Sequence, residues 1–350
     1  MQARFLDLGT LAPQALHAAY HGLALAQDEG ARPILAWARS AAAHVCIGQT
    51  QSAPEELDLE ACAQAQVAVV RRTLGGGTVL LDDEQRCVFF ILPLTLAAAR
   101  PQRIFRYCLD PLARTYRSFG IDARQVGRAD LWVSDAKIAG SGAATLGHSI
   151  VFASSFILRF PEALFCRLVR APSPEFRAWL GAALPCAFTS WARVGAVPDD
   201  AILVQILRAA VAADLGWDLE PDLPSAQERH AMHEAEEELQ ADDASGDAVE
   251  ERRRIRNGIK INARTFLVES RDGDDWLRVL LANGRIARID THDAVAAAAL
   301  ERCVGRSARF ADLEDGLGRV LTPSAARHWA RRVELCLTGA GADDAAAEND

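Results

Sequence analysis

A glycine-rich loop between two apolar strands restricts the folds open to this chain more than any other feature. Residues 67–93, VAVVRRTLGGGTVLLDDEQRCVFFILP, predict three strands joined by short connections. The first strand ends at a run of three glycines, Gly75, Gly76 and Gly77. A strand follows these glycines directly, whereas a P-loop and a dinucleotide-binding turn each need a helix there. The loop is neither of these, and it favours neighbouring strands over regular βαβ repeats.

The same loop has features of an anion-binding site. Arg71 and Arg72 end the strand that precedes it. Glycines let the backbone approach a ligand and aim its amides inward. Three glycines alone would favour the flexible tip of a hairpin loop. The two arginines directly before them favour an anionic ligand instead, and a phosphate or acyl-phosphate fits.

Lysine is almost absent from the chain. Lysine and arginine together number 38, and only Lys137 and Lys260 are lysines. Arginine has a planar fork, whereas lysine has a compact ammonium on a flexible stem that can follow charge from one oxygen to another. Lys137 is therefore a candidate catalytic cation that shares a negative ligand with Arg72. Asp130, upstream of it, could hold a divalent cation or orient Lys137; the alternatives are a solvent-exposed Asp130 and a chance position for Lys137.

The remaining elements predict an α+β fold with a mixed or antiparallel sheet flanked by helices. Apolar periodicity and turn residues mark these elements. We predict helices at 12–28, 55–66 and 100–119, strands at 32–39 and 44–49, a hairpin formed by 131–142 and 149–160, and a strand-then-helix section to about 217.

A change of composition near residue 225 predicts a second domain. The next residues are polar and charged, lack a sustained apolar stripe, and indicate a helix followed by a linker. Asn283-Gly284 then predicts a hairpin turn within a small α+β unit. We therefore predict a large domain at 1–225, a charged helix and linker at 226–254, a small domain at 255–338 and a disordered tail at 339–350.

Charge and hydropathy exclude several classes of protein. The formal charge is −9 over 350 residues, which argues against nucleic acid as the main partner. No apolar run approaches the ~18 residues of a membrane span, and the N-terminus lacks the layout of a signal peptide. We expect a cytoplasmic protein without membrane association. His230, His233 and Glu234 have helical metal-ligand spacing, but their charged surroundings favour a solvated face, so no permanent metal site is predicted.

Three motifs occur in the order and at the separations found in the lipoate–protein ligase family. CIGQTQSAPEELD, RRTLGGGTVLLD and GRADLWVSDAKIAGSG resemble that family's iGr-Q motif, its RRxxGGGxVxhD motif, and its Gly-Arg-Asn-Asp-like segment followed by K-[IV]-x-G-[ST]-A. The resemblance covers roughly residues 1–225, and residues 255–338 look like the accessory domain of many such ligases. It implies a fold like that of biotin and lipoate ligases.

The resemblance further implies an ATP-dependent lipoate–protein ligase. Lipoate would attack the α-phosphate of ATP, giving lipoyl-AMP and pyrophosphate, and a lysine of a lipoyl-acceptor protein or domain would then take the lipoyl group. Lys137 would follow the charge through both steps, and Mg²⁺ would bridge the ATP oxygens. The implied substrate-binding residues are Arg72, Gly75, Gly76, Gly77, Thr78, Gly140 and Ser141, with Asp130, Lys137 and Asp82 near the ATP and metal.

The chain departs from the family pattern at several positions. Leu81, before Asp82, stands where the family usually has histidine, and Ala129 stands where it has asparagine. AATLGHS follows the lysine motif in place of an arginine and a His-Gly-Thr segment, so His148 or Ser154 could occupy that region. These departures leave open the acceptor side and the choice between lipoate and octanoate.

Two other functions fit the same family resemblance. An octanoyl or lipoyl transferase of the same fold would need an activated thiol close to Lys137. No cysteine lies between Cys108 and Cys166, which disfavours that chemistry; the eight cysteines instead predict small buried hydrophobic residues. A non-catalytic lipoyl-binding scaffold is the other alternative, motivated by the altered family positions.

Overall fold

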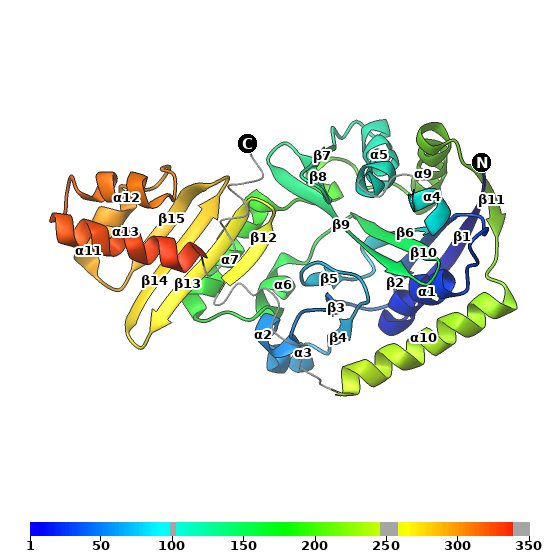
Figure 1. The fold of residues 1–350 in the computed structure, drawn as a ribbon, viewed down its shortest axis with the longest axis horizontal. Coiled ribbons are helices and arrows are strands. Elements are labelled where there is room, and N and C mark those ends of the chain that lie inside the picture. The colour runs from blue at the N-terminus through cyan, green and yellow to red at the C-terminus, as the bar shows by residue number, and fades with distance from the viewer. Residues whose placement is uncertain (99–102, 246–257, 339–350) are drawn as a thin grey trace. The chain divides into compact units, whose positions relative to one another are not determined.

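The computed structural model describes residues 1–98, 103–245 and 258–338 and forms two compact units (Figure 1). The first unit comprises Met1–Val169 and Thr189–Val249, and the second comprises Arg170–Phe188 and Glu250–Asp350. Both combine sheets with packed helices, which confirms the predicted α+β class. The tail at 339–350 and residues 246–254 of the predicted linker lie outside the described residues.

A mixed sheet forms the centre of the first unit. Its described strands are ordered β11-β1-β2-β6-β10-β9-β8-β7. Strands β11, β1 and β2 run parallel to one another, and the remaining pairs, including β2 with β6, are antiparallel. The strands are β1 (Gln2–Leu11), β2 (Ile34–Ser40), β6 (Gln85–Pro93), β7 (Arg124–Val126), β8 (Asp130–Val133), β9 (Ala136–Leu146), β10 (Ser149–Ile157) and β11 (Asp218–Asp222).

Helices cover both faces of this sheet. Helix α5 (Ile104–Ser118) and helix α9 (Asp200–Leu215) pack on one face, around Tyr116, Phe156 and Trp191. Helix α1 (Pro13–Leu25) packs on the other. The shorter helices of this unit are α2 (Ala53–Glu56), α3 (Leu59–Gln64), α4 (Leu94–Ala98), α6 (Glu162–Leu168) and α8 (Trp191–Val194). Among the described helices, none is long and apolar enough to cross a membrane.

The predicted hairpin of 131–142 and 149–160 is wrong in one respect, because the structure forms three strands there. Ser134, with φ of 52°, turns the chain between β8 and β9, and Gly147, with φ of 53°, turns it between β9 and β10. A non-glycine residue in the left-handed region gives no strong turn signal in the sequence, so the first turn was missed. Lys137 therefore lies near the start of a strand and not within one long strand.

A smaller sheet carries the glycine-rich loop. Strand β3 (His44–Ile47) lies between β4 (Ala68–Arg71), to which it is parallel, and β5 (Val79–Leu81), to which it is antiparallel. The loop joins β4 to β5 and must pass the end of β3. It is therefore a crossing connection and not the tip of a hairpin.

Helix α10 (Ala226–Ser245), which is the helix expected in the charged segment, packs against α1. Gly22 of α1 makes the close approach possible, since a Cβ there would lie 2.3 Å from the backbone nitrogen of Met232. Ala18, Ala235 and Leu239 form a small buried cluster between the helices. Among the described side chains of α10, only Glu228, Ala235 and Leu239 are buried, which explains why the sequence shows no sustained apolar face.

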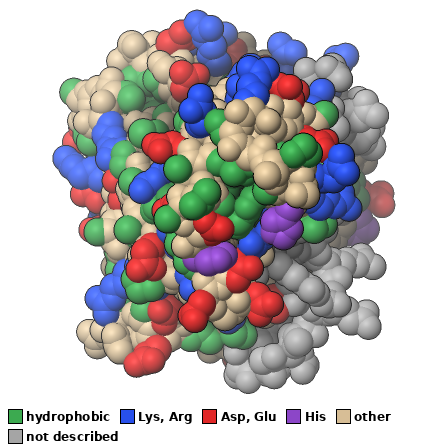
Figure 2. Space-filling model, turned by 90° about the vertical axis from the view of Figure 1, so that its left-hand side faces the viewer, with side chains coloured by type: hydrophobic (Ala, Val, Ile, Leu, Met, Phe, Trp, Pro, Cys, Tyr) green, Lys and Arg blue, Asp and Glu red, His purple; other side chains and the backbone are tan. Residues whose placement is uncertain are grey.

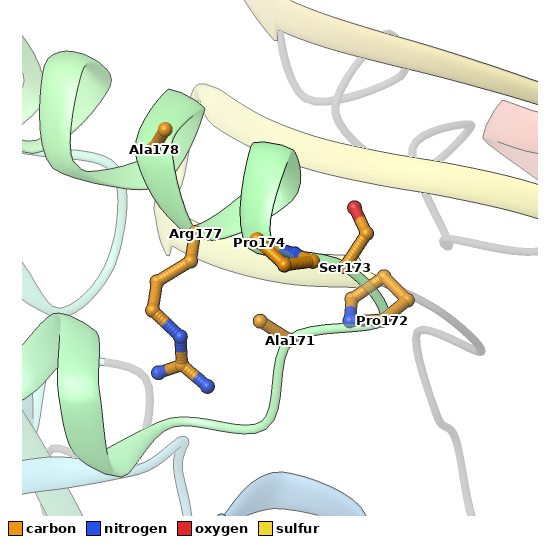
Figure 3. A pocket seen from close by; sticks show the side chains of 6 residues that line it. All are labelled: Ala171, Pro172, Ser173, Pro174, Arg177 and Ala178. Atoms are coloured by element: carbon orange, nitrogen blue, oxygen red, sulfur yellow. The ribbon is translucent and has the colours of Figure 1, made fainter.

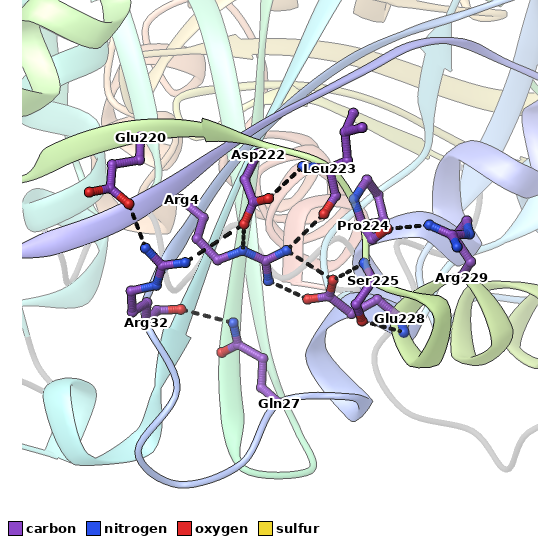
Figure 4. Close-up of polar contacts among 10 residues, drawn as sticks. All are labelled: Arg4, Gln27, Arg32, Glu220, Asp222, Leu223, Pro224, Ser225, Glu228 and Arg229. Atoms are coloured by element: carbon purple, nitrogen blue, oxygen red, sulfur yellow. Dashed lines mark hydrogen bonds and ion pairs between the residues drawn. The ribbon is translucent and has the colours of Figure 1, made fainter.

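A group of ion pairs fixes the start of α10 (Figure 4). The Arg4 guanidinium pairs with Asp222 at 2.7 Å and with both carboxylate oxygens of Glu228. Ser225 and Glu228 cap the helix reciprocally, with Ser225 N donating to Glu228 Oε2 at 2.7 Å and Glu228 N to Ser225 Oγ at 3.1 Å. Burial alone would raise the pKa of Glu228, but the hydrogen bonds from Arg4 and Ser225 outweigh it and lower that pKa.

The second unit is an antiparallel sheet with helices on one face. Its strands are β12 (Gly258–Asn262), β13 (Thr265–Asp272), β14 (Asp275–Ala282) and β15 (Arg285–Thr291), and α11 (Ala294–Glu301), α12 (Phe310–Leu317) and α13 (Pro323–Thr338) share their core. Asn283 and Gly284 have φ of 52° and 70°, as the predicted hairpin turn requires. On the face in Figure 2, acidic, basic and hydrophobic side chains are interspersed, and no single charge dominates its described residues.

Helix α7 (Pro174–Ala187) belongs to this second unit, although the sequence placed it inside the domain at 1–225. Arg278 of β14 pairs with Glu269 of β13 at 2.6 Å and donates to Ser173, the N-cap of α7, at 3.1 Å. The guanidinium of Arg288 lies 3.9 Å from the ring centroid of Trp179 in α7. These buried polar and cation–π contacts fix α7 to the sheet and are invisible in the local sequence.

Candidate functional site

The turn between β8 and β9 brings Lys137 to Asp130. Asp130 begins β8 and pairs with Gly140 of β9, and the register of the two strands shifts between Leu131 and Trp132. The Lys137 Nζ lies 2.9 Å from Asp130 Oδ1, and both side chains are mostly buried. Of the two roles predicted for Asp130, the contact that orients Lys137 is the one present in the structure.

Two glycines of β9 place Lys137 beside the glycine-rich loop. A Cβ at Gly140 would lie 2.7 Å from Lys137 Nζ, and a Cβ at Gly142 would lie 3.2 Å from the carbonyl oxygen of Gly75. Residues two apart in a strand face the same side, roughly 7 Å from each other. Lys137 and the loop therefore lie over one face of β9, and two motifs about 60 residues apart in the sequence, 75–77 and 137–142, meet there.

A close backbone contact shapes the loop. Gly76 has φ of 104°, a conformation that favours glycine. Its carbonyl oxygen would lie 2.3 Å from a Cβ at Gly48, the residue after β3. Gln49 N also donates to Leu74 O at 3.3 Å. The segment after β3 and the glycine loop are thus stacked so closely that Gly48 tolerates no side chain.

Arg72 contacts the backbone of the glycine loop. Its side chain is 7% exposed, and its guanidinium donates to the carbonyl oxygens of Cys46 at 3.0 Å, Gly75 at 3.1 Å and Gly77 at 2.7 Å. Arg72 therefore supports the loop through these carbonyl oxygens, and its contact with a negative ligand stays a prediction. The C=O and N–H groups of a trans peptide point in opposite directions. Because the carbonyl groups of Gly75 and Gly77 point toward the guanidinium, the N–H groups of Gly76 and Thr78 point away from it.

Gln51 is a residue of the site that the sequence analysis did not single out. Its Oε1 accepts from Gly48 N at 2.8 Å, and its Nε2 donates to Thr78 Oγ1 at 3.3 Å. Arg71 donates to the Gln51 carbonyl oxygen at 2.6 Å. Gln51 thus connects the segment after β3 to the end of the glycine loop, and Thr78, predicted to bind substrate, takes part in this contact. The motif that contains Gln51 was the available signal.

Two serines fix the backbone of β9. Ser141 Oγ donates to the carbonyl oxygen of Ala129 at 2.6 Å, and Ser154 Oγ donates to that of Gly140 at 2.9 Å. Ser141 alternates with Gly140 and Gly142, so its side chain points to the opposite face from Lys137. The hydroxyl of Ser141 thus holds β8, and the role of Ser141 in substrate binding stays a prediction.

Asp82 does not join this group. It follows β5, whereas the glycine loop precedes β5, so the two lie at opposite ends of that strand. Its Oδ1 accepts from Glu84 N at 3.0 Å within the turn to β6, and burial raises the pKa of its carboxyl. The prediction that Asp82 lies near the ATP and metal is not supported by this position.

Six of the eight thiols predicted to be buried hydrophobic residues are buried, whereas Cys336 is partly exposed and Cys186 is exposed. Cys108 and Cys166 lie in the core, and burial raises the pKa of Cys108 well above its ordinary value. A buried thiol with a raised pKa is a poor nucleophile. Among the described residues, no group of three or more His, Cys, Asp or Glu could hold a metal ion.

An open hollow lies elsewhere, at the N-terminal end of α7 in the second unit (Figure 3). It is lined by Ala171, Pro172, Ser173, Pro174, Arg177 and Ala178. None of the predicted site residues lines it, and the buried Ser173 hydroxyl is already hydrogen-bonded to Glu269 and Arg278. The hollow is therefore separate from the group around Lys137.

Comparison with known proteins places this geometry in context. Residues 17–178 match the model of the lipoyl protein ligase A/B catalytic domain. No curated protein matches the chain. Among solved structures, the chain is similar to one from the archaeal lipoylation system of Thermoplasma acidophilum, a bipartite lipoate protein ligase with its E2 lipoyl domain (19% identity, TM-score 0.65, 72% of this chain and 99% of that one).

Two further structures share the fold. One is a lipoate-protein ligase A bound with ATP (18% identity, TM-score 0.57, 68% of this chain and 95% of that one). The other is LipL1 of P. falciparum in complex with lipoate (15% identity, TM-score 0.55, 93% of this chain and 98% of that one). At these identities the likeness establishes the fold alone, and it confirms the fold expected from the motifs.

Proposed function

Because the chain belongs to the lipoyl protein ligase A/B family through residues 17–178, we propose that it is an ATP-dependent lipoate–protein ligase. It activates lipoate to lipoyl-AMP and transfers the lipoyl group to a lysine of an acceptor protein or domain. The observation that carries this proposal is the position of the Lys137–Asp130 pair beside the glycine loop, on one face of β9.

In the first step, a carboxylate oxygen of the acid attacks the α-phosphorus of ATP. A new oxygen–phosphorus bond forms, and the bond to the β-phosphate oxygen breaks with release of pyrophosphate. Negative charge passes from the carboxylate to the phosphate oxygens and then to the leaving group. Lys137 supplies one compact positive charge that can follow it, and Asp130 at 2.9 Å holds the ammonium in place.

The glycine loop contributes backbone donors. Arg72 draws the carbonyl oxygens of Gly75 and Gly77 toward itself, so the amides of Gly76 and Thr78 are directed outward. Fixed amide donors stabilise charge that develops on phosphate or acyl oxygens without having to reorganise. In this account Arg72 and Gln51 are positioning residues of the loop.

Mg²⁺ enters with ATP as part of the substrate. It favours few protein ligands, commonly one or two carboxylates together with phosphate oxygens and water. Asp130 is the carboxylate beside Lys137 and is the residue that fits this role. The ion supplies charge neutralisation on the phosphates when bound.

In the second step, the amine of the acceptor lysine attacks the activated carbonyl. An amide forms, the bond between the carbonyl carbon and the AMP oxygen breaks, and the neutral amine releases one of its two protons to solvent. Lys137 stabilises the carbonyl oxygen as it gains charge. The acceptor is a lipoyl-acceptor protein or domain, and the acid is lipoate or octanoate.

An ATP–pyrophosphate exchange assay with a panel of dithiolane and short-chain acids tests the proposal. We expect exchange that depends on Mg²⁺ and on lipoate or octanoate. The ranking of the panel then identifies the acid. Absence of exchange with every acid would contradict the proposal, and a trapped acyl-thioester would then point to a transferase.

A further inference from the structure

The backbone of Lys137 is attached to the point at which the chain returns from the second unit. The Lys137 carbonyl oxygen accepts a hydrogen bond from Thr189 N at 2.8 Å. Thr189 is the first residue of the first unit after the excursion Arg170–Phe188. Its side chain is 6% exposed, and the next residue, Ser190, is also buried.

The other end of this connection is fixed within the second unit. Ala187, the last residue of α7, has its carbonyl oxygen bound by Asn262 Nδ2 at 2.7 Å. Asn262 lies in β12 and is 3% exposed, and its Oδ1 accepts from Arg264 N at 2.8 Å. Both halves of its amide are therefore engaged, which fixes its orientation.

The span between these two anchors is short and extended. Only Phe188 separates Ala187 from Thr189, and its φ and ψ are −139° and 142°. Two residues extend at most about 7 Å, so this extended connection cannot lengthen much further. Because α7 is also fixed to the second sheet through Ser173, Glu269 and Arg278, its C-terminal end moves with that sheet.

We propose that Ala187–Thr189 couples the second unit to the catalytic lysine, with Thr189 as a positioning residue for Lys137. Lys137 is held on one side by β8, through its pairing with Trp132, and on the other by Thr189. A displacement of α7 draws Thr189 N away from the Lys137 carbonyl and shifts Nζ relative to Asp130. The inference rests on the proposed function in so far as Lys137 is the catalytic cation.

Two variants of one residue separate the backbone contact from the side chain. Thr189→Pro removes the N–H donor, and the extended Phe188 before it has the conformation that a following proline requires. Thr189→Ala keeps the donor and is the matched control. Should Thr189→Pro fail to fold, a backbone ester between residues 188 and 189 removes the same donor with no change of side chain.

The scarcity of lysine supplies a readout that does not depend on activity. An amine-acylating reagent can modify two lysines, Lys137 and Lys260, and peptide mass spectrometry resolves them. Lys260 is exposed and serves as the internal reference. We expect the labelling of Lys137 relative to Lys260 to rise in Thr189→Pro or the ester and to stay unchanged in Thr189→Ala. Equal ratios in all these proteins would overturn the coupling.

Kinetics then test whether the displaced lysine matters for the reaction. We expect Thr189→Pro to lower the kcat of ATP–pyrophosphate exchange by about ten- to a hundred-fold, with the KM for ATP nearly unchanged. In a Lys137→Ala background the same change should cause no further loss. Asn262→Asp, which keeps the acceptor and loses the donor, should lower kcat in the same way.

The two proposals fail in distinguishable ways. If the wild-type protein catalyses no exchange, the proposed ligase activity is contradicted. The ratio of Lys137 to Lys260 labelling still tests the proposed coupling in that case. If the wild-type protein catalyses exchange but the folded Thr189→Pro variant has unchanged labelling and an unchanged kcat, the proposed ligase activity is supported and the proposed coupling is contradicted.

Discussion

At the scale of single residues, sequence and structure agree best where a residue is rare. Lys137 could be predicted because lysine is scarce, and its pairing with Asp130 realises one of the two roles expected for that aspartate. The hydrogen-bond partners of Arg72 could not be predicted, because they are carbonyl oxygens. Every residue has such an oxygen, and only the path of the backbone shows which ones an arginine reaches.

Gly140 has no side chain, and the amine of Lys137 occupies the space that a side chain there would fill. A Cβ there would lie 2.7 Å from Nζ and 2.9 Å from Cε of Lys137, which are the flexible end of that side chain. We expect Gly140→Ala to displace the amine and lower the rate of acyl-adenylate formation by about tenfold or more, with the melting temperature little changed.

Gly30→Ala is the matched control, because a Cβ there meets no atom within 4 Å. Single-turnover formation of the acyl-adenylate, measured by rapid quench, gives the rate. A Gly140→Ala variant as fast as wild type would show that Lys137 does not act from this position.

A buried pair of histidines predicts how stability depends on pH. His17 Nε2 lies 3.1 Å from His44 Nε2, and burial lowers the pKa of His44 to about 4 and that of His17 well below its usual value. Both are neutral in the folded protein and titrate near 6.5 when unfolded. Because the unfolded state binds more protons below that pH, stability is full above 6.5 and falls as the pH drops toward 4, by on the order of 3 kcal/mol for His44.

Urea denaturation at a series of pH values measures this effect. His44→Gln removes one titrating group and keeps a polar side chain, so its free energy of unfolding should fall less steeply between pH 6.5 and 4. A slope equal to that of wild type would contradict a neutral buried His44.

At the scale of elements, local pattern predicted strands and helices but not how they meet. The strands at 67–93 and the helix α10 are present, yet the placement of β3 between β4 and β5 had no local signal. The docking of α10 has no local signal because few of its described side chains are buried and because it depends on a glycine in another helix. Such contacts are set by pairing at long range in the chain, which periodicity does not report.

The crossing of α1 and α10 gives a direct test. A Cβ at Gly22 would lie within 2.5 Å of three backbone atoms at residues 231 and 232, and backbone cannot move aside as a side chain can. We expect Gly22→Ala to displace α10 and to destabilise the protein by about 1–3 kcal/mol. Denaturant unfolding and amide hydrogen exchange over 226–240 measure the two effects. Gly30→Ala again controls for the substitution, and stability equal to wild type would show that the helices do not cross so closely.

At the scale of the whole molecule, the sequence indicated two domains but not which helices and strands belong to each. A change of charge and hydropathy predicts a small second domain, and the structure forms two compact units. Helix α7 was assigned to the larger domain because it lies among that domain's residues in the chain. The structure groups it with the second unit through Ser173 and Trp179, whose partners lie about 100 residues later. Domain membership depends on those partners, and composition cannot reveal them.

This grouping predicts the outcome of truncation. A chain ending at residue 246 keeps α7 but loses β14 and β15, whose Arg278 and Arg288 lie over the ring of Trp179. We expect the catalytic domain to fold with an exposed apolar helix, seen as increased binding of a hydrophobic dye. Adding Trp179→Gln to the truncated chain should reduce that binding. Equal dye binding by the full-length and truncated proteins would contradict the assignment of α7 to the second unit.

We propose that Lys137 drives an ATP-dependent transfer of a lipoyl group to a protein lysine. Its most direct test is the intact mass of a purified lipoyl-acceptor domain after incubation with the protein, lipoate, Mg²⁺ and ATP. We expect one lipoyl addition on one lysine, absent without ATP. We also expect the rate of addition to be at least ~10²-fold lower for Lys137→Arg, because a planar guanidinium cannot follow the moving charge, whereas the rate for Lys260→Arg should match wild type. Addition without ATP, or near-normal addition by Lys137→Arg, would contradict the account.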